Sequence, residues 1–420
     1  MSGEVKLESR LNRTVFQALP SPQKLYVLID IVPTGAGVAV QMPVNLGLVL
    51  DRSGSMAGDK IRKVREAVKL VLGRLSPQDL VSIVLFDDNV DTLVACQPVA
   101  NLAQLHAQID RITDRGGTTM SKGMRRGLDE MRQGVTPDRV SRMLLLTDGE
   151  TFGDEDQCRQ LATEAGQYGI PVSALGLGEE WNMPLLEAVA GQSGGVVDHL
   201  ETPDSILAEF QRTVATMQGS VARNAQLTLR LVTGVSPAAA WRVLPAISQL
   251  NQRTLSDRDI QLILGDLEQG KGQSVLVEVI VQPKAAGAYR VAQADVMYDM
   301  PAAGLTGQHV RQDILVTLTD DPSQVTPFVA DVMNLVEKVS VFKLQTRALS
   351  EAQTGNVALA TQQLRAAATR LLNLGEADLA QAAEQEANNL EQQGQMSASG
   401  TKKLQYGTRK LTQRLDDLES

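Results

Sequence analysis

Residues 46–60, LGLVLDRSGSMAGDK, carry the most informative pattern in this chain. An apolar run from Val44 to Leu50 ends at Asp51, and Ser53 and Ser55 follow at every second position. A nearly continuous apolar strand is typical of a sheet that helices cover on both faces. Side chains two apart in extended backbone point the same way, so three oxygens can converge at this strand end. One carboxylate and two hydroxyls suit a hard divalent cation such as Mg²⁺.

The pattern of strands alternating with helices continues to about residue 217. Apolar runs such as RMLLLTDG and IPVSALGLG alternate with segments of helical period, of which residues 60–75 are the first. The alternation predicts an α/β fold, a doubly wound and mostly parallel sheet in the Rossmann-like manner. Ligands of such sheets bind at the carboxyl ends of the strands.

Both flanks of this region have β character. KLYVLIDIV (residues 24–32) alternates well, and GVAVQMP (37–43) reads as a second short strand. Between residues 224 and 320, five apolar runs each have the length of a strand: QLTLRLV, IQLILGDL, QSVLVEVIV, AYRVAQADVMY and DILVTLT. We therefore expect an α/β domain at 43–220, inserted into a β-sandwich that residues 1–42 and 221–322 form together.

Residues 323–420 favour helices. Thr326 is a suitable N-cap with Pro327 at the first helical position. Gly355 and Gly375 separate two further helices, and residues 394–400 read as a linker before a last helix at 402–418.

Three ligands are too few for an octahedral ion, so other donors are needed. Thr118 lies in RGGTTM, which opens a helix, and Asp148 lies in LLLTDGE, which ends a strand. The predicted topology places both at the same sheet edge as Asp51. Thr119 is adjacent, so the choice of threonine stays open. The alternative is that the two serines only cap a turn.

DRSGS, GGTT and LLTDGE, in this order, resemble the von Willebrand factor A domain and its metal-ion-dependent adhesion site, D-x-S-x-S, then T, then D. The resemblance implies that Asp51, Ser53, Ser55, Thr118 and Asp148 hold Mg²⁺, with Mn²⁺ or Ca²⁺ as alternatives. It also implies capture of an Asp or Glu carboxylate from a protein partner, coupled to movement of the last helix of the domain, residues 205–218.

The layout with a flanking β-sandwich and C-terminal helices resembles bacterial intracellular members of this family. Such members often work beside AAA+ ATPases of the MoxR or chelatase type, which implies a scaffold or adaptor. Heavy chains of the inter-α-inhibitor are a looser parallel.

Composition excludes several classes. The net charge of −9 argues against nucleic acid as a partner. No apolar run approaches the roughly 20 residues that a membrane span needs. The start, MSGEVKLESR, does not read as a secretory signal, and Cys96 and Cys158 offer no disulfide framework, so a cytoplasmic location is expected.

The sequence does not favour an enzyme. It contains no P-loop, and His106, His199 and His309 are scattered without zinc spacing. The competing hypotheses are a metal-dependent hydrolase and a surface adhesin exported by a non-classical route. Asp87 and Asp88 are interpreted as a hairpin turn or as neighbours of the metal. Trp181 is interpreted as part of a partner surface or as an ordinary strand-end residue.

Overall fold

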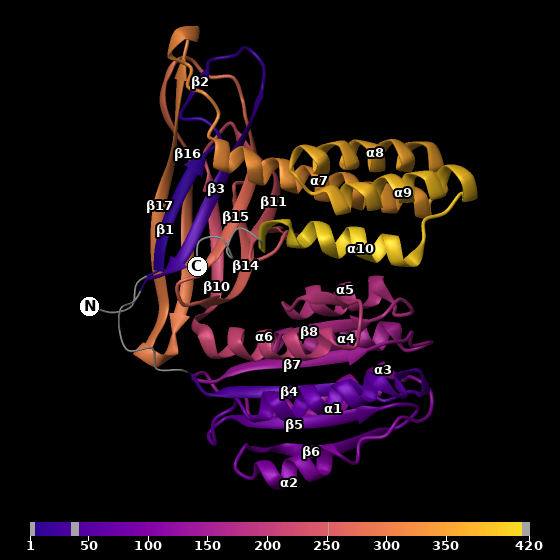
Figure 1. Cartoon of the computed structure of the whole chain (residues 1–420). Helices are drawn as coiled ribbons and strands as arrows, with labels where there is room; N and C mark the ends of the chain where they lie inside the picture. Colours follow the sequence, from indigo (N-terminus) through magenta and orange to yellow (C-terminus); the bar gives the residue numbers. More distant parts are fainter. Residues whose placement is uncertain (1–4, 35–41, 251, 414–420) are drawn as a thin grey trace. The chain divides into compact units, whose positions relative to one another are not determined.

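The computed structural model describes residues 5–34, 42–250 and 252–413. The chain divides into two compact units, Ala39–Val221 and, together, Met1–Val38 with Ala222–Ser420. Each unit is described by itself below, and Figure 1 shows the elements of both.

The unit Ala39–Val221 is built on a six-stranded sheet with the order β6-β5-β4-β7-β8-β9. Neighbouring strands are parallel except β6, which pairs antiparallel with β5 at one edge. The strands are β4 (Val44–Asp51), β5 (Leu80–Phe86), β6 (Val90–Pro98), β7 (Val140–Thr147), β8 (Val172–Leu177) and β9 (Val197–Leu200). The helices are α1 (Asp59–Leu72), α2 (Leu102–Ile109), α3 (Met120–Arg132), α4 (Glu155–Gln167), α5 (Met183–Ser193) and α6 (Ser205–Gly219).

Strand β4 is buried along its whole length because helices pack on both of its faces. Leu46, Leu48 and Leu50 belong to a core with residues of α1 and α6. Gly47 and Val49, which alternate with them, contact α3. A central parallel strand covered on both sides is what the apolar run predicted, and the doubly wound α/β fold is confirmed.

The other unit contains two sheets that pack face to face. One has the order β1-β3-β15-β11-β12 and the other β13-β14-β10-β16-β17-β2. The first comprises β1 (Val5–Leu11), β3 (Gln23–Pro33), β15 (Gln273–Val281), β11 (Val235–Leu244) and β12 (Ser248–Gln249). The second comprises β13 (Gln252–Thr254), β14 (Asp259–Glu268), β10 (Ser220–Leu231), β16 (Gly287–Met300), β17 (Leu305–Thr319) and β2 (Val15–Gln17). Strands from both sides of the α/β region share these sheets, so the predicted insertion into a β-sandwich is confirmed.

A stack of helices adjoins the outer face of the first sheet, which α7 (Ala330–Gln353) contacts directly at β3 and β11. Along β3, Val27 and Ile29 face the sandwich core, whereas Leu28 belongs to a cluster with the helices. The helices are α7 (Ala330–Gln353), α8 (Val357–Asn373), α9 (Ala377–Gln393) and α10 (Ala398–Arg409). Figure 1 shows them stacked beside the strands, which confirms the predicted helical region.

In three places this unit differs from what the sequence analysis predicted. The first helix begins at Ala330 and not at Pro327, because the Thr326 hydroxyl accepts hydrogen bonds from the backbone N–H groups of Thr14 and Val15. Strand β11 was not predicted, since Pro237 and three alanines make it a poor strand former. Helix α10 begins inside the expected linker, where the hydroxyl of Ser397 accepts a bond from the Gly400 N–H.

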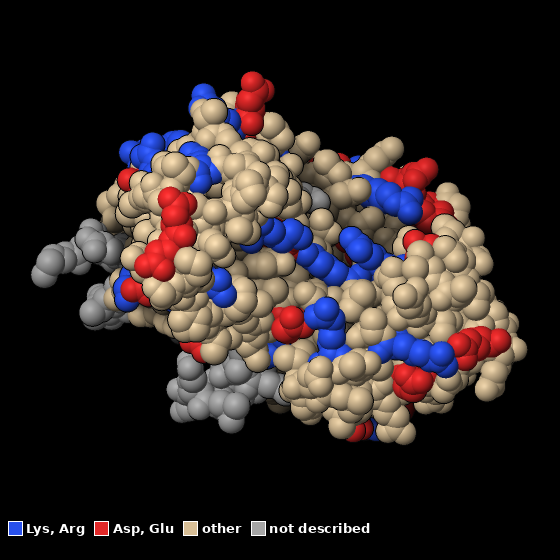
Figure 2. All heavy atoms as spheres, turned by 90° about the horizontal axis from the view of Figure 1, so that it is seen from above, with Lys and Arg blue, Asp and Glu red and all other residues tan. Residues whose placement is uncertain are grey.

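Two predictions extend beyond the described residues. Most of the short strand expected at 37–43, and the end of the last helix beyond residue 413, lie outside them. Among the described residues, no helix combines the length and the apolar character that crossing a membrane requires. Figure 2 shows both basic and acidic side chains on the drawn face, with a run of Lys and Arg near its middle.

Candidate metal centre

Asp51, the last residue of β4, has a completely buried side chain whose two oxygens are both bonded. Its Oδ1 accepts from the Ser53 N–H at 2.8 Å, and its Oδ2 accepts from the Thr147 hydroxyl at 2.6 Å. Thr147 ends β7, the neighbouring parallel strand. The carboxylate therefore joins two strand ends at the carboxyl edge of the sheet.

Hydrogen bonds through Ser53 and Ser55 connect this carboxylate to Asp148. The hydroxyl oxygens of Ser53 and Ser55 are 3.1 Å apart, and Ser55 Oγ donates to Asp148 Oδ1 at 2.7 Å. The other carboxylate oxygen of Asp148 forms an ion pair with Lys60 at the start of α1. Residues that are 93 positions apart in the sequence thus meet directly.

The hydroxyl of Thr118 lies beside the same group. A Cβ atom built on Gly149 would be 3.8 Å from Ser55 Oγ and equally 3.8 Å from Thr118 Oγ1. The next residue, Thr119, donates its N–H to the carbonyl of Asp87 at 2.9 Å and immediately precedes α3. The structure therefore brings all five predicted residues to one rim of the sheet, while their role as metal ligands remains a prediction.

The chemistry of this donor set fits a hard divalent cation. Burial, with a smaller contribution from the charge of Asp148, raises the pKa of Asp51 to about 6 despite hydrogen bonds from Thr147 and Ser53. A cation close to both carboxylates would oppose these effects. Hydroxyl and carboxylate oxygens are ligands that Mg²⁺ accepts.

The site contains few acids. Within 5–34, 42–250 and 252–413, no three or more His, Cys, Asp and Glu side chains are grouped so that they could hold a metal ion. A cation at this rim would therefore depend on the serine and threonine hydroxyls.

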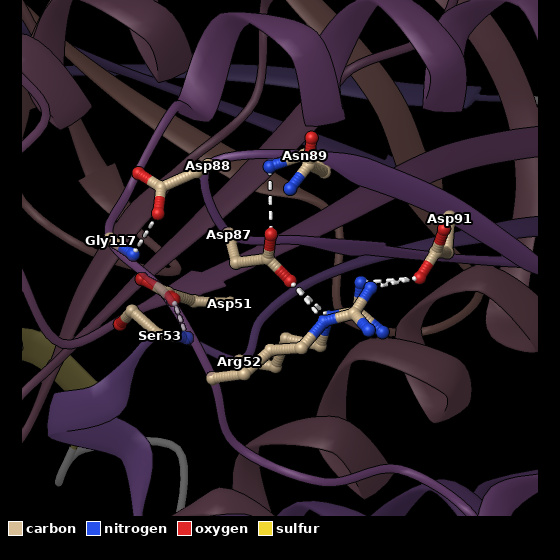
Figure 3. Close-up of polar contacts among 9 residues, drawn as sticks. Asp51, Arg52, Ser53, Asp87, Asp88, Asn89, Asp91 and Gly117 are labelled. Carbon is tan, nitrogen blue, oxygen red and sulfur yellow. Dashed lines mark hydrogen bonds and ion pairs between the residues drawn. The ribbon is translucent and has the colours of Figure 1, made fainter.

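Asp87 forms the predicted turn between β5 and β6, and its carboxylate also pairs with Arg52, which lies between the donor residues Asp51 and Ser53. Its Oδ1 accepts from the Asn89 N–H at 2.7 Å, and its Oδ2 pairs with Arg52 at 2.6 Å (Figure 3). Burial by itself raises the pKa of Asp87, but hydrogen bonds from Asn89, Arg115 and Arg52 outweigh it and hold the pKa below its usual value. The neighbouring Asp88 accepts from the Gly117 N–H at 2.8 Å.

The loop after β7 fixes the beginning of α3. Thr151 donates its hydroxyl to the carbonyl of Thr118 at 3.2 Å and accepts from the Met120 N–H at 3.3 Å. Asp154 accepts from the Ser121 N–H at 2.8 Å, which satisfies one of the free donors at the helix start. Between these two anchors, Phe152 is 79% exposed.

The interpretation of Trp181 as a partner surface was wrong. Its side chain is 2% exposed, and its ring packs so closely on Gly176 that a Cβ there would be 2.1 Å away. The indole N–H donates to the carbonyl of Gly178 at 2.9 Å. Trp181 therefore supports the end of β8 from inside.

Sequence reasoning missed two residues that contact the donors, Thr147 and Lys60. Thr147 directly precedes Asp148 at the same strand end, so its position was a usable signal. Lys60 lies nine residues after Asp51 at the entry to α1, and only the fold directs its side chain to Asp148.

Two family models match this chain. Residues 45–213 match the von Willebrand factor type A domain, and residues 330–414 match the Sll0103-like, C-terminal alpha-helical domain. A protein of Synechocystis, named only as uncharacterized protein sll0103, is 33% identical over 274 residues, which cover 63% of this chain and 64% of that protein. The inter-alpha-trypsin inhibitor heavy chain H3 of Mesocricetus auratus is 32% identical over 167 residues, 37% of this chain and 19% of its own length.

Solved structures share the fold across nearly the whole chain. A von Willebrand factor type A protein from Catenulispora acidiphila has a TM-score of 0.77 at 16% identity, covering 97% of both chains. The ArnB paralog VWA2 from Sulfolobus acidocaldarius has a TM-score of 0.57 at 15% identity, covering 97% of this chain and 99% of that one. At these identities the likeness concerns the fold. Domains of the matched type are typically metal-dependent modules for protein binding and are usually not catalytic.

Proposed function

Because this chain belongs to the von Willebrand factor type A domain proteins, we propose that it is a metal-dependent binding module for a protein partner that presents an Asp or Glu. The observation that supports this most directly is the joining of Ser53, Ser55 and Asp148 at one rim of the sheet, next to buried Asp51. Asp51, Ser53, Ser55, Thr118 and Asp148 would hold the ion, for which we propose Mg²⁺.

Charge counting supports binding over hydrolysis. Two carboxylates face the rim, and one of them, Asp148, already shares its charge with Lys60. A dication held mainly by neutral hydroxyls keeps net positive charge and, when bound, supplies an open position that an external carboxylate can fill. Hydrolytic sites of this kind often use two metals, which need more acids than this rim offers.

The surface beside the rim indicates what accompanies the acid of the partner. Phe152, four residues after Asp148, offers an exposed aromatic ring for an apolar side chain. A groove of about 570 Å³ along α3 and α4 is lined by the basic side chains of Lys122 and Arg126 and by the acid Asp129. We propose that the partner segment has an apolar residue and further acids close to the one that reaches the metal.

A cytoplasmic adaptor beside an AAA+ ATPase of the MoxR or chelatase type is the biological setting that we propose. Such an ATPase would be retained by the immobilised full chain in Mg²⁺ and released by EDTA. Retention that EDTA does not change would argue against this setting.

The metal site is tested by titrating the purified full chain with Mg²⁺ in a calorimeter. We expect binding by the wild type and a loss of at least about tenfold in affinity in Asp51→Ala and in Ser53→Ala, because each removes a donor or its support. Asp59→Ala is the matched control, since this acid is 63% exposed and pairs with Arg62. A wild type that binds no Mg²⁺, or donor variants that bind like the control, would refute the proposal.

The partner surface is tested separately with Phe152→Ser. This variant should keep the Mg²⁺ affinity of the wild type and weaken capture of the partner, since Phe152 lies outside the donor set. Equal loss of metal binding and capture would mean that the substitution damages the rim itself.

A further inference from the structure

The segment 113–119, which connects α2 to α3 and carries Thr118, is attached to the rim by paired arginine and aspartate side chains. Arg52 Nε lies 2.6 Å from Asp87 Oδ2, and Arg115 Nε lies 3.0 Å from the same oxygen. The second arms of the two guanidinium groups meet Asp91 Oδ2, at 2.5 Å from Arg52 and 2.6 Å from Arg115. We call Arg52, Arg115, Asp87 and Asp91 the arginine clamp; Figure 3 shows Arg52 with both acids.

We propose that Arg115 is a positioning residue, which holds segment 113–119 through the arginine clamp so that Thr118 stays at the rim and Mg²⁺ is bound tightly. The inference rests on the proposed function, because it concerns the same metal site. It adds a residue that does not touch the donors and sits in none of the motif positions.

Backbone bonds connect the clamp to both parts of the donor set. The N–H of Arg115 donates to the carbonyl of Arg52 at 2.7 Å, and the N–H of Gly54 donates to the carbonyl of Gly116 at 3.0 Å. Arg52 and Gly54 alternate with Asp51, Ser53 and Ser55 along the chain. The two bonds therefore join segment 113–119 to the serine segment on either side of Ser53.

The two glycines before Thr118 allow this close attachment. Gly116 has a φ of +72°, and a Cβ atom on it would lie 3.0 Å from Asp88 Oδ2. A Cβ atom on Gly117 would lie 2.5 Å from Asp88 Oδ1. The segment approaches the β5–β6 turn more closely than side chains would permit, and the bonds of Asp87 and Asp88 keep it there.

Burial distinguishes the two halves of the clamp. The side chains of Asp87 and Arg52 are 1% and 7% exposed, whereas those of Arg115 and Asp91 are 54% and 52% exposed. Removing a partner from a buried pair is strongly destabilising. Arg115 is the exposed cation of the clamp, and its replacement still leaves Asp87 paired with buried Arg52.

The sign of the effect separates positioning from plain electrostatics. Removing a positive charge near a dication favours metal binding by Coulomb's law. Loss of the clamp instead frees Thr118, and Mg²⁺ tolerates poor geometry less than Ca²⁺ does, because it demands near-ideal octahedral coordination. Weaker Mg²⁺ binding with little change for Ca²⁺ therefore identifies positioning.

The test compares Arg115→Ala, Arg115→Lys and Arg125→Ala in the full chain. Arg125 is the matched control, because it is 49% exposed and pairs with Glu164 at 2.9 Å, away from the clamp. We expect Arg115→Ala to weaken Mg²⁺ binding about tenfold, as is typical for residues that support metal ligands. Ca²⁺ affinity should change far less, Arg115→Lys should restore part of the Mg²⁺ affinity, and Arg125→Ala should match the wild type.

Two further measurements assign the effect to Thr118. In a Thr118→Val background, Arg115→Ala should add little further loss of Mg²⁺ affinity, since the group it positions is already missing. In the metal-free chain, hydrogen exchange of the Gly116, Gly117 and Thr119 amides should be faster in Arg115→Ala than in Arg125→Ala.

The possible outcomes distinguish a failure of the clamp, an effect of Arg115 that does not pass through Thr118, and a failure of the metal site itself. If Thr118→Val weakens Mg²⁺ binding and Arg115→Ala does not, the clamp has no positioning role while the metal site stands. If Arg115→Ala lowers the Mg²⁺ affinity by the same factor in the wild-type and in the Thr118→Val background, Arg115 does not act through Thr118. If the wild type binds no divalent ion, the proposed function and this inference both fail.

Discussion

At the scale of single residues, two buried aspartates have pKa values that are shifted in opposite directions, because their partners differ. Asp51 has no Lys, Arg or His partner within the described part of the chain, and burial raises its pKa to about 6. Asp295, a residue of β16, is 2% exposed. Its carboxylate pairs with Arg230 at 2.9 Å, Arg311 at 3.0 Å and His309 at 2.8 Å. Burial by itself would raise its pKa, but the hydrogen bonds from His309 and Arg311 outweigh it and lower the pKa. The comparison shows what Asp51 lacks and a metal ion would supply.

The lowered pKa of Asp295 predicts a pH dependence of stability. Its ionised form is favoured in the folded state, so the stabilisation is present above the unfolded pKa of 3.8 and is lost as the pH falls through the lower folded value. Asp295→Asn should lower the free energy of unfolding by roughly 1–3 kcal/mol at pH 7 and by less at pH 3. Urea unfolding followed by tryptophan fluorescence measures both.

Asp313→Asn is the control for this prediction. Asp313 also pairs with an arginine, Arg290, at 3.3 Å, but it is 46% exposed, so its loss should change stability little. A difference between Asp295→Asn and the wild type that is as large at pH 3 as at pH 7 would contradict the assignment.

At the scale of elements, α3 is positioned by glycines. A Cβ atom on Gly123 would lie 2.7 Å from the Phe86 ring, and one on Gly127 would lie 2.4 Å from Val49 Cγ2. The helix thus lies closer to β4 and β5 than larger residues would permit. Because Thr118 lies only two residues before the first residue of this helix, Met120, the packing of α3 on the sheet also sets the geometry of the rim.

Gly123→Ala should therefore be destabilising although alanine is the better helix former. The methyl group must displace the Phe86 ring, and overpacking of this kind costs about 1–3 kcal/mol. Mg²⁺ affinity should fall as well, because α3 and Thr118 move together. Urea unfolding and calorimetric titration measure the two effects.

Gly191→Ala in α5 is the matched control. Nothing lies within 4 Å of a Cβ atom at that position, so only helix propensity changes. This variant should be up to about 1 kcal/mol more stable than the wild type. If both substitutions changed stability in the same direction, close packing of α3 would not be the reason.

At the scale of the whole molecule, one unit is formed by two chain segments, one before and one after the other unit in the sequence. Strand β3 pairs with β15 along Gln273–Val281, about 250 residues later in the chain. Helix α6 ends at Gly219 and β10 begins at Ser220, so the α/β region continues into the sandwich without a linker at this C-terminal junction. Movement of α6 on partner binding remains a prediction, and this direct connection is the route by which it would reach the sandwich.

The helices of the C-terminal region should depend on Trp241. This residue of β11 is 5% exposed and meets the Phe342 ring edge-on, with 6.0 Å between ring centroids. Trp241→Ala should cost about 3–5 kcal/mol in the unit that contains it. Hydrogen exchange should rise in β11 and α7, while Mg²⁺ affinity should stay unchanged because the site belongs to the other compact unit.

Leu315→Ala is the control for Trp241→Ala, since Leu315 is 62% exposed and should tolerate truncation. A loss of Mg²⁺ affinity in Trp241→Ala comparable to the loss of stability would indicate that the two units do not behave independently.

Periodicity alone was sufficient for the α/β fold and for the inserted arrangement, because buried strands and amphipathic helices repeat with different periods. It failed at β11, whose alanines form a strand only because β15 pairs with them, and at Thr326, whose hydroxyl bonds to the backbone of β2 and not to a helix start. Both failures come from partners that are distant in the sequence.

The order Asp51, Ser53, Ser55, Thr118 and Asp148 was readable in the sequence, since parallel strands bring their carboxyl ends to one edge. Only the tertiary structure decided that Lys60 shares Asp148, that Trp181 is buried and that Arg115 reaches Asp87 and Asp91. The physical reason is that periodicity reports which face of an element is buried, whereas the partner of a charged side chain depends on how loops from separate strands pack together.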